Sequence, residues 1–229
     1  YGAFTWYPAN DQPSDEALYD ISVTVPAGWS AVASGTPAGQ EGNPFRYHSA
    51  DPVASYLATL AVGQYQKESS KGPRGVPLTY WYPAGTEQGL LKVIRKSPAY
   101  LTWLEKLFGP YPFPSAGIVI VDSESGMETQ QMITMGGKVG KWSADKAAEF
   151  EANVLHEYAH QWFGDSVTPT TWKDLWLNEG WATYIQFLYE QERDKFPDRF
   201  LELFLRKQDK ALRAELGPPG SPSPAHFAE

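Results

Sequence analysis

The first third of the chain carries apolar and polar residues in short runs, which is typical of β-strands. Leu18–Val25 alternates with period two and ends at a Pro-Ala-Gly turn. Three further short runs are rich in β-branched or aromatic residues and are separated by Pro and Gly; they span 29–33, 44–48 and 56–62. The pattern predicts an antiparallel, β-rich part over residues 1–67, which ends just before the polar, breaker-rich stretch 69–75.

The remaining residues, 68–229, have the pattern of strands followed by helices. Apolar runs at 76–82 and 117–121 predict strands. Apolar residues at helical spacing predict a helix over 86–108, which Pro98 breaks or kinks. Further helices are predicted over 144–163, over about 169–191 and over about 193–216, with Ser143 as the N-cap and Gly164 as the end of the first of them. The predicted class is α+β with two domains, 1–67 and 68–229.

Composition supports a folded chain and narrows the classes of partner. The 229 residues are 42% hydrophobic and include nine Trp, which argues against disorder. The net charge of -8 disfavours nucleic acid or an anionic membrane as the main partner, because both need basic patches. The chain contains no Cys, which excludes disulfides and a thiol nucleophile.

The ends of the chain carry no targeting pattern. No apolar run approaches the roughly 20 residues of a membrane-spanning helix, and the first residues lack the pattern of a signal peptide. We expect both ends to be cuts within a longer protein. The compartment is left open, with a cytoplasmic one favoured.

The residues 156–160, His-Glu-Tyr-Ala-His, carry the clearest chemistry. Two histidines four apart on a helix differ by about 40° in direction, so both imidazoles can bind one metal ion. Glu157 lies beside that face, where its carboxylate can reach a water at the metal without binding the metal. This spacing is known from zinc hydrolases that use the glutamate as general base.

A catalytic zinc site usually needs a third protein ligand, and here it must be His, Asp or Glu. The other histidines, His48 and His226, have no helical context. Glu179 lies on the next predicted helix, with 18 residues between it and His160, and an antiparallel return would bring it to the metal. Two imidazoles and a carboxylate form the ligand set of known zinc peptidases.

Several neighbours of Glu179 have predicted roles as well. Asp174 and Asn178 lie one turn apart and could orient the ligand from behind, although helix capping is the alternative role for Asp174. Four aromatic residues at helical spacing near the metal ligands are predicted to be core residues: Tyr158, Trp162, Trp176 and Trp181.

The stretch 156–168, followed by Trp172 and by Leu175–Gly180, resembles the aminopeptidase N family of zinc exopeptidases, which are gluzincins. The dense likeness covers about 25 residues, and the order of a β half and a zinc half extends it to most of the chain. The resemblance implies an N-terminal β-saddle domain followed by a thermolysin-like catalytic domain, both incomplete here. It also implies one Zn²⁺ held by His156, His160 and Glu179, with Glu157 as general base.

The same family has a Gly-x-Met-Glu-Asn segment on an edge strand, which holds the free amino terminus of the substrate. The matching residues here are Ser125-Gly126-Met127-Glu128-Thr129, with departures at Ser125 and Thr129. The resemblance implies that Glu128 pairs with the α-ammonium group. Two roles are open for Met127: it lines the first side-chain pocket of the substrate, or it is a packing residue. A second amine-binding glutamate and a transition-state tyrosine are expected outside this chain.

These observations predict a zinc aminopeptidase that removes single residues from peptides with a free N-terminus. Its expected partners are those peptides and the remaining N- and C-terminal parts of the same protein, and the chain alone is expected to be poorly active. One alternative is a binding or scaffold protein that uses zinc only for stability, although such a site needs no base like Glu157. Another is the epoxide-hydrolysing branch of the same superfamily, which shares the zinc ligands.

Overall fold

The protein has an α+β fold, as the sequence predicts. The computed structural model describes residues 3–40, 42–195, 202, 205–206 and 209. Its strands are β1 (Glu16–Ala17), β2 (Asp20–Val23), β3 (Ser30–Ala33), β4 (Thr36–Pro37), β5 (Phe45–His48), β6 (Val53–Ala54), β7 (Leu60–Gly63), β8 (Tyr65–Lys71), β9 (Pro77–Pro83), β10 (Ala116–Val121) and β11 (Met132–Gly136). Its α-helices are α1 (Gln88–Ile94), α2 (Ser97–Phe108), α3 (Ala144–His160) and α4 (Leu175–Asp194).

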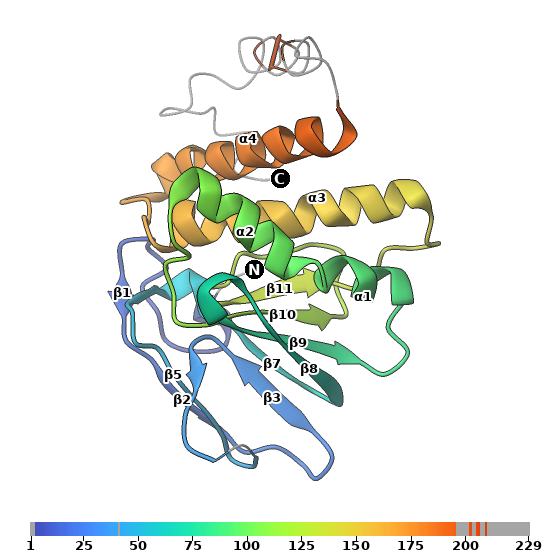
Figure 1. Cartoon of the computed structure of the whole chain (residues 1–229). Coiled ribbons are helices and arrows are strands. Elements are labelled where there is room, and N and C mark those ends of the chain that lie inside the picture. Colours follow the sequence, from blue (N-terminus) through green and yellow to red (C-terminus); the bar gives the residue numbers. More distant parts are fainter. Residues whose placement is uncertain (1–2, 41, 196–201, 203–204, 207–208, 210–229) are drawn as a thin grey trace.

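The N-terminal strands form small antiparallel sheets that lie together at one end of the molecule (Figure 1). Strand β5 pairs with both β2 and β4, β3 pairs with β7, and β1 pairs with β6. The predicted run 56–62 is divided, because a 3-10 turn at Ser55–Leu57 precedes β7. Strand β8 runs through the expected domain boundary after residue 67, and the division into two domains stays a prediction.

The four-stranded sheet has the strand order β11-β10-β9-β8, and its inner strand β10 is buried on both faces, whereas the residues of the edge strand β8 are exposed or half-buried. Strand β10 is parallel to β9 and β11, whereas β8 is antiparallel to β9. Successive side chains on a strand point to opposite faces. Tyr80 and Ile118 therefore belong to the core under the helices, whereas Trp81 and Val119 belong to a core on the other face with Val32 of β3. Burial on both faces explains the continuous apolar run of β10.

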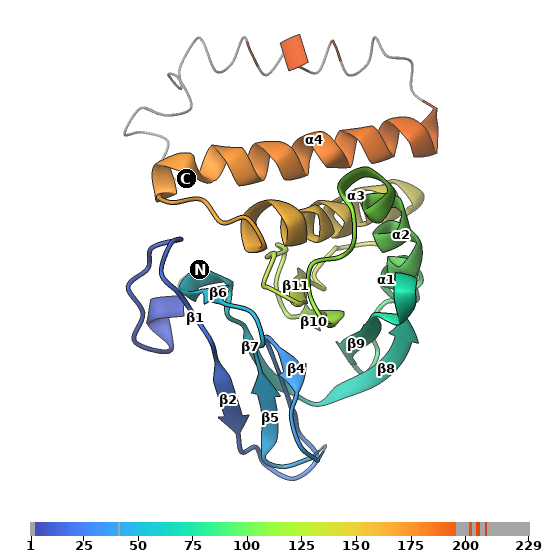
Figure 2. The same cartoon turned by 60° about the vertical axis from the view of Figure 1, so that its left-hand side comes forward.

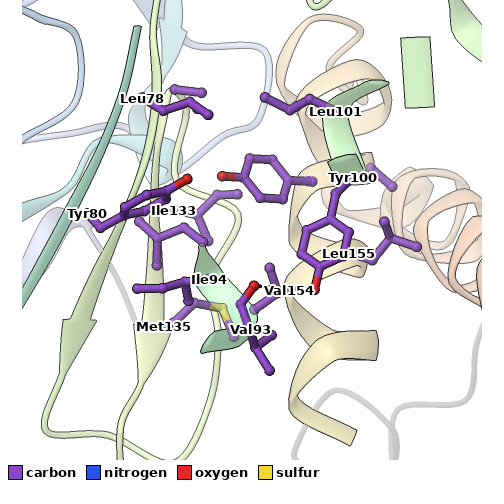
Figure 3. Packing of buried hydrophobic residues seen from close by; sticks show 14 of the residues in the cluster. Leu78, Tyr80, Val93, Ile94, Tyr100, Leu101, Ile133, Met135, Val154 and Leu155 are labelled. Atoms are coloured by element: carbon purple, nitrogen blue, oxygen red, sulfur yellow. Dashed lines mark hydrogen bonds between the residues drawn. The ribbon is translucent and has the colours of Figure 1, made fainter. Parts of the chain in front are cut away.

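Helices cover one face of this sheet in two layers (Figures 1 and 2). Helices α1, α2 and α3 lie on the sheet, and α4 packs on the outer side of α3. Figure 3 shows Tyr80 and Ile133 of the sheet facing Tyr100 of α2 and Val154 of α3. None of the helices in the described ranges has the length and hydropathy needed to cross a bilayer.

The predicted helix over 86–108 is two helices. Helix α1 ends at Ile94, and α2 begins at Ser97 with Pro98 in its first turn. Proline is favoured there because the first helical N–H groups have no partner within the helix. Helix α4 extends to Asp194, and the helix predicted over 193–216 falls largely outside the described residues.

A buried carboxylate joins α3 to the helices on both sides of it. Glu151 Oε1 accepts hydrogen bonds from Lys96 Nζ (2.9 Å), Tyr100 Oη (2.8 Å) and Tyr189 Oη (3.2 Å). Its Oε2 lies 3.5 Å from the Arg193 guanidinium. Because Tyr189 and Arg193 belong to α4 and Tyr100 belongs to α2, one side chain connects three helices.

We predict that Glu151→Ala lowers the free energy of unfolding by about 2 kcal/mol. Removing one partner of a buried ion pair costs about 3–5 kcal/mol, and the half-exposed Lys96 reduces this loss. Urea unfolding of the metal-free protein measures the change. Glu149→Ala is the matched control, since Glu149 on the same helix is exposed and should lose less than about 0.5 kcal/mol. Equal losses in the two variants would contradict the role of Glu151.

The contribution of Glu151 to the free energy of unfolding should depend on pH. Burial alone would raise the pKa of Glu151, but the hydrogen bonds from Lys96 and Tyr100 outweigh it and hold the pKa below its usual value. A carboxyl with a lowered folded-state pKa stabilises the fold above its unfolded pKa of about 4.3. The difference between wild type and Glu151→Ala should therefore shrink as the pH falls below about 4.

Candidate metal centre

The two histidines of the 156–160 motif lie in the last turns of α3. Ser143 Oγ accepts a hydrogen bond from the backbone N–H of Lys146 (3.2 Å), which confirms the predicted N-cap. The helix ends at His160, three residues earlier than predicted, and continues as a π-helical turn, Gln161–Asp165. In this turn Gly164 has φ +137, a conformation that L side chains rarely adopt.

Only a glycine fits at position 164 because the turn lies against α4, the helix that carries Glu179. A Cβ there would lie 2.9 Å from Asn178 Nδ2 and 3.3 Å from His160 Nδ1. The close approach also places the Phe163 carbonyl 3.1 Å from His160 Nδ1. An N–H donated from Nδ1 to this carbonyl leaves Nε2 free to bind a metal, which is how backbone carbonyls commonly orient histidine ligands.

The second metal helix, α4, begins at Leu175 after a 3-10 turn at Trp172–Asp174. Asp174 Oδ2 accepts a hydrogen bond from Thr171 Oγ1 (3.0 Å). This side-chain contact lies in the turn just before α4. The Asn178 side chain is buried behind Glu179, and neither of its polar atoms has a partner among the described residues. The orienting roles of Asp174 and Asn178 stay predictions.

The structure brings three predicted ligand atoms together. His156 Nε2 lies 3.0 Å from His160 Nε2, and Glu179 Oε2 lies 3.3 Å and 3.6 Å from these two nitrogens. A tetrahedral zinc ion with bonds of about 2.0–2.1 Å keeps its ligand atoms about 3.3–3.4 Å apart. The spacing and the donor set of two imidazoles and one carboxylate therefore fit zinc without rearrangement.

The pKa values of two of these residues, His160 and Glu179, are shifted in opposite directions. Burial would lower the pKa of His160, but its hydrogen bond to Glu179 and the charges of Glu128 and Glu157 outweigh burial and raise it to about 9. Burial would raise the pKa of Glu179, but its hydrogen bonds to His156 and His160 hold it well below its usual value. A positive charge is thus stabilised at the position where a cation would bind.

Glu157 lies beside the ligands in a buried position. It is 8% exposed, and a Cβ at Gly126 would overlap its Oε1, so the glycine makes room for this carboxylate. Burial raises the pKa of Glu157 to about 8, the charges of Glu128 and Glu179 add to the shift, and His160 opposes it. A cation at the three ligands would act in the same direction as His160. A carboxylate with a pKa near neutrality is suited to take up and return a proton.

The Glu128 segment follows the outer edge of the sheet. Met127 and Thr134 of β11 exchange two backbone hydrogen bonds of 2.8 and 3.0 Å, in antiparallel fashion. Glu128 is 5% exposed, and single ligand atoms of Glu128, Glu157 and His160 all lie within 4.8 Å of one another. The predicted anchor therefore adjoins both the predicted base and a metal ligand.

Glu128 and Glu179 open onto the same cleft, which has a volume of about 550 Å³. Its walls come from the N-terminal part, the Glu128 segment, β11 and the start of α4. Its residues are Ala3, Thr5, Trp6, Asp11, Tyr56, Ala58, Thr59, Leu60, Met127, Glu128, Thr129, Thr134, Trp172, Leu175 and Glu179.

Three further residues lie near the site; Gln161 and Asp165 belong to the stretch 156–168 that resembles the family, whereas Tyr56 has no recognisable signal in the sequence. Tyr56 reaches the cleft from the N-terminal part, where burial and then the charges of Glu128, Asp165 and Glu179 raise its pKa. Burial, with the charges of Glu128 and Glu157, also raises the pKa of Asp165 well above its usual value. Gln161 is fully buried between these segments.

The prediction that four aromatic residues are core residues is correct for two of them. Tyr158 and Trp162 are buried, whereas Trp176 and Trp181 are each 46% exposed. The predicted core role is wrong for the latter pair because α4 packs on α3 with one face only. Trp181 still stacks on Phe163, with ring centroids 5.3 Å apart.

Comparison with known proteins identifies relatives of this chain. The model of the peptidase family M1 domain matches residues 94–215, more than half of the chain. Aminopeptidase N of Streptomyces lividans is 30% identical over 190 residues, which cover 77% of this chain and 22% of that protein. Human aminopeptidase RNPEPL1 is also 30% identical, over 80% of this chain and 25% of that protein.

Solved structures show the same fold. The M1 zinc metallopeptidase of Deinococcus radiodurans is 31% identical, with a TM-score of 0.75, over 94% of this chain and 49% of that one. A mutant of that enzyme with a bound Tyr-Ser-Ala substrate has a TM-score of 0.80 at 30% identity, over 96% of this chain and 51% of that one. The chain thus spans about a quarter of the first two curated relatives and half of these structures. With its family model, its relatives and its fold in agreement, the chain belongs to peptidase family M1.

Proposed function

We propose that this chain carries the zinc site, the general base and the amine anchor of an aminopeptidase. One observation carries the proposal: a triangle of ligand atoms at zinc spacing has the buried carboxylates of Glu157 and Glu128 beside it. The names of the relatives support the same activity, since they are aminopeptidases and zinc metallopeptidases.

Each of the predicted site residues would have a separate role in the reaction. Bound at His156, His160 and Glu179, zinc would supply a Lewis acid that polarises the scissile carbonyl and lowers the pKa of water from 15.7 toward about 7. Glu157 would take the proton of the attacking water and pass it to the leaving amine. Gly126 keeps the space in which the Glu157 carboxylate lies.

Glu128 would make the enzyme an exopeptidase. Its carboxylate would bind the α-ammonium group of the substrate, so that the first peptide bond lies over the metal ligands and only one residue is released. The first side chain would then enter the cleft beside Met127, whose other walls include Trp6, Tyr56 and Trp172. The proposed substrates are therefore peptides with a free N-terminus.

We also infer that further parts of the protein cover this chain. Trp176, Leu177 and Trp181 expose 46%, 42% and 46% of their surfaces on α4, and large apolar patches of this kind mark interaction surfaces. The chain's small share of its relatives' length agrees with such partners. A cytoplasmic location stays a prediction.

Glu157→Gln should keep zinc but reduce hydrolysis of an aminoacyl anilide by about 10²–10⁴-fold, because the amide cannot accept the proton. Initial rates and metal analysis of the full-length protein measure both quantities. Glu149→Gln, on the exposed side of the same helix, is the matched control and should leave both unchanged.

The same assay separates the alternatives. Unchanged turnover in Glu157→Gln would reject the assigned base. One zinc per chain without any turnover in the wild type would favour the scaffold protein, and hydrolysis of a lipid epoxide instead of the anilide would favour the epoxide-hydrolysing branch.

Glu179→Gln should weaken zinc binding by at least about 10²-fold, since it removes the charged ligand but keeps the side-chain shape. Competition with a chromophoric chelator measures the affinity. Glu190→Gln on the same helix is the control, because Glu190 lies away from the metal ligands and contacts Gln186. Equal zinc affinities in the two variants would show that Glu179 is not a ligand.

Glu128→Gln should raise KM for an aminoacyl anilide by about 10–100-fold, because a hydrogen bond to a charged group contributes about 1.5–3 kcal/mol. The zinc content should stay at one per chain. Steady-state kinetics measure KM and kcat separately. A variant that loses kcat alone, with KM unchanged, would contradict the anchoring role.

A further inference from the structure

The amide of Gln161 is fully buried and uses its whole hydrogen-bonding capacity. Its Oε1 accepts from the backbone N–H of Gln131 (2.9 Å) and from Tyr111 Oη (3.1 Å). Its Nε2 donates to the backbone carbonyl of Glu128 (3.0 Å) and to Asp165 Oδ2 (2.6 Å). Asp165 belongs to the same π-helical turn as Gln161, whereas the other three partners lie on segments distant in the chain.

The orientation of this amide is determined by its partners. The backbone N–H of Gln131 can only donate, and the backbone carbonyl of Glu128 can only accept, so the oxygen and nitrogen of Gln161 cannot be exchanged. A buried polar group with every hydrogen bond made is held rigidly, and removing it leaves its partners unsatisfied in the interior.

Two of the four bonds hold the ends of the turn that carries the amine anchor. Glu128 and Gln131 bracket this turn, and Gln131 has φ +65, which is unfavourable for a residue other than glycine. Gln161 directly follows the metal ligand His160 in the chain. It therefore connects the metal helix to the backbone of the anchor residue itself.

The rest of the turn is held from other directions. The backbone N–H of Gln130 donates to the carbonyl of Leu57 (3.1 Å) in the N-terminal part. Met127, on the other side of Glu128, is paired with β11. Gln161 supplies direct hydrogen bonds between this segment and the end of α3, and they fix the backbone of Glu128 relative to the predicted metal ligands.

We propose that Gln161 is a positioning residue for substrate recognition: it places Glu128 so that its carboxylate meets the α-ammonium group while the peptide bond lies at the metal. This inference rests on the proposed aminopeptidase function. A misplacement of about 1 Å can cost about 10²-fold in an enzyme reaction, and it would act here on amine binding and not on the metal.

The test compares Gln161→Met with the wild type in the zinc-loaded, full-length protein. Methionine has a similar volume and makes none of the four bonds. We expect KM for an aminoacyl anilide to rise by about tenfold or more, with kcat per bound zinc changed by less than about threefold. The inhibition constant of a free amino acid should rise in parallel, whereas its weakly binding N-acetyl derivative should show no such rise.

Two further variants complete the test. Gln186 is a half-buried glutamine of α4 that contacts Glu190, and the variant Gln186→Met should behave as the wild type. Tyr111→Phe removes one hydroxyl and one bond to Gln161, so KM should rise by about two- to fivefold. If Gln161→Met does not fold, Tyr111→Phe decides the outcome.

A purely structural role would lower the melting temperature and the active fraction without changing KM or the inhibition constant. That result in an active enzyme would overturn the inference alone. A wild type that hydrolyses no substrate with a free amine would overturn the proposed function, and this inference with it.

Discussion

The antiparallel contact between α3 and α4 is the constraint on which the metal centre depends. His156 and His160 meet Glu179 at one end of the contact, and Glu151 meets Tyr189 at the other. His160 lies nine positions after Glu151 in the chain, and Tyr189 lies ten positions after Glu179. At about 1.5 Å per residue these spans are about 14 and 15 Å, so the distance between the two contacts is nearly the same along both helices. A slip of one residue would turn a helix by about 100° and break both of them together.

Acidic side chains outnumber basic ones at the candidate metal centre, and several of them are buried. Glu128, Glu157 and Asp165 are all buried within one region, and burial raises the pKa of the latter two. Such a group of carboxylates is stabilised by cations, because like charges in a buried site oppose each other's ionisation. The proposed function places two cations here: the metal ion at the histidines and the ammonium group of the substrate at Glu128. The acidity of the site thus agrees with both binding roles.

The turn after Glu128 is where three parts of the molecule meet. The N-terminal part holds it through Leu57 of the 3-10 turn, β11 holds it through paired backbone groups, and the turn after α3 holds it through Gln161. Thr129, which departs from the family pattern, bonds through its hydroxyl to the carbonyl of Met132 and so closes the turn. The position of Glu128 therefore depends on the packed molecule, and the proposed mechanism needs the N-terminal part as well as α3 and α4.

Features that depend on residues close together in the chain could be predicted before the fold was known. The spacing within 156–160, the Ser143 N-cap and the apolar runs of the central sheet follow from periods of two to four residues. The place of Glu179 on the next predicted helix predicts it as the third metal ligand, whereas the predicted role of Glu128 rests on the resemblance to a family motif. Two features became visible only in the folded molecule: Gln161 contacts Glu128, 33 residues away in the chain, and Trp181 lies on an exposed face of α4. The physical reason is that periodicity shows which residues share a face, whereas contacts with distant segments decide which face is covered.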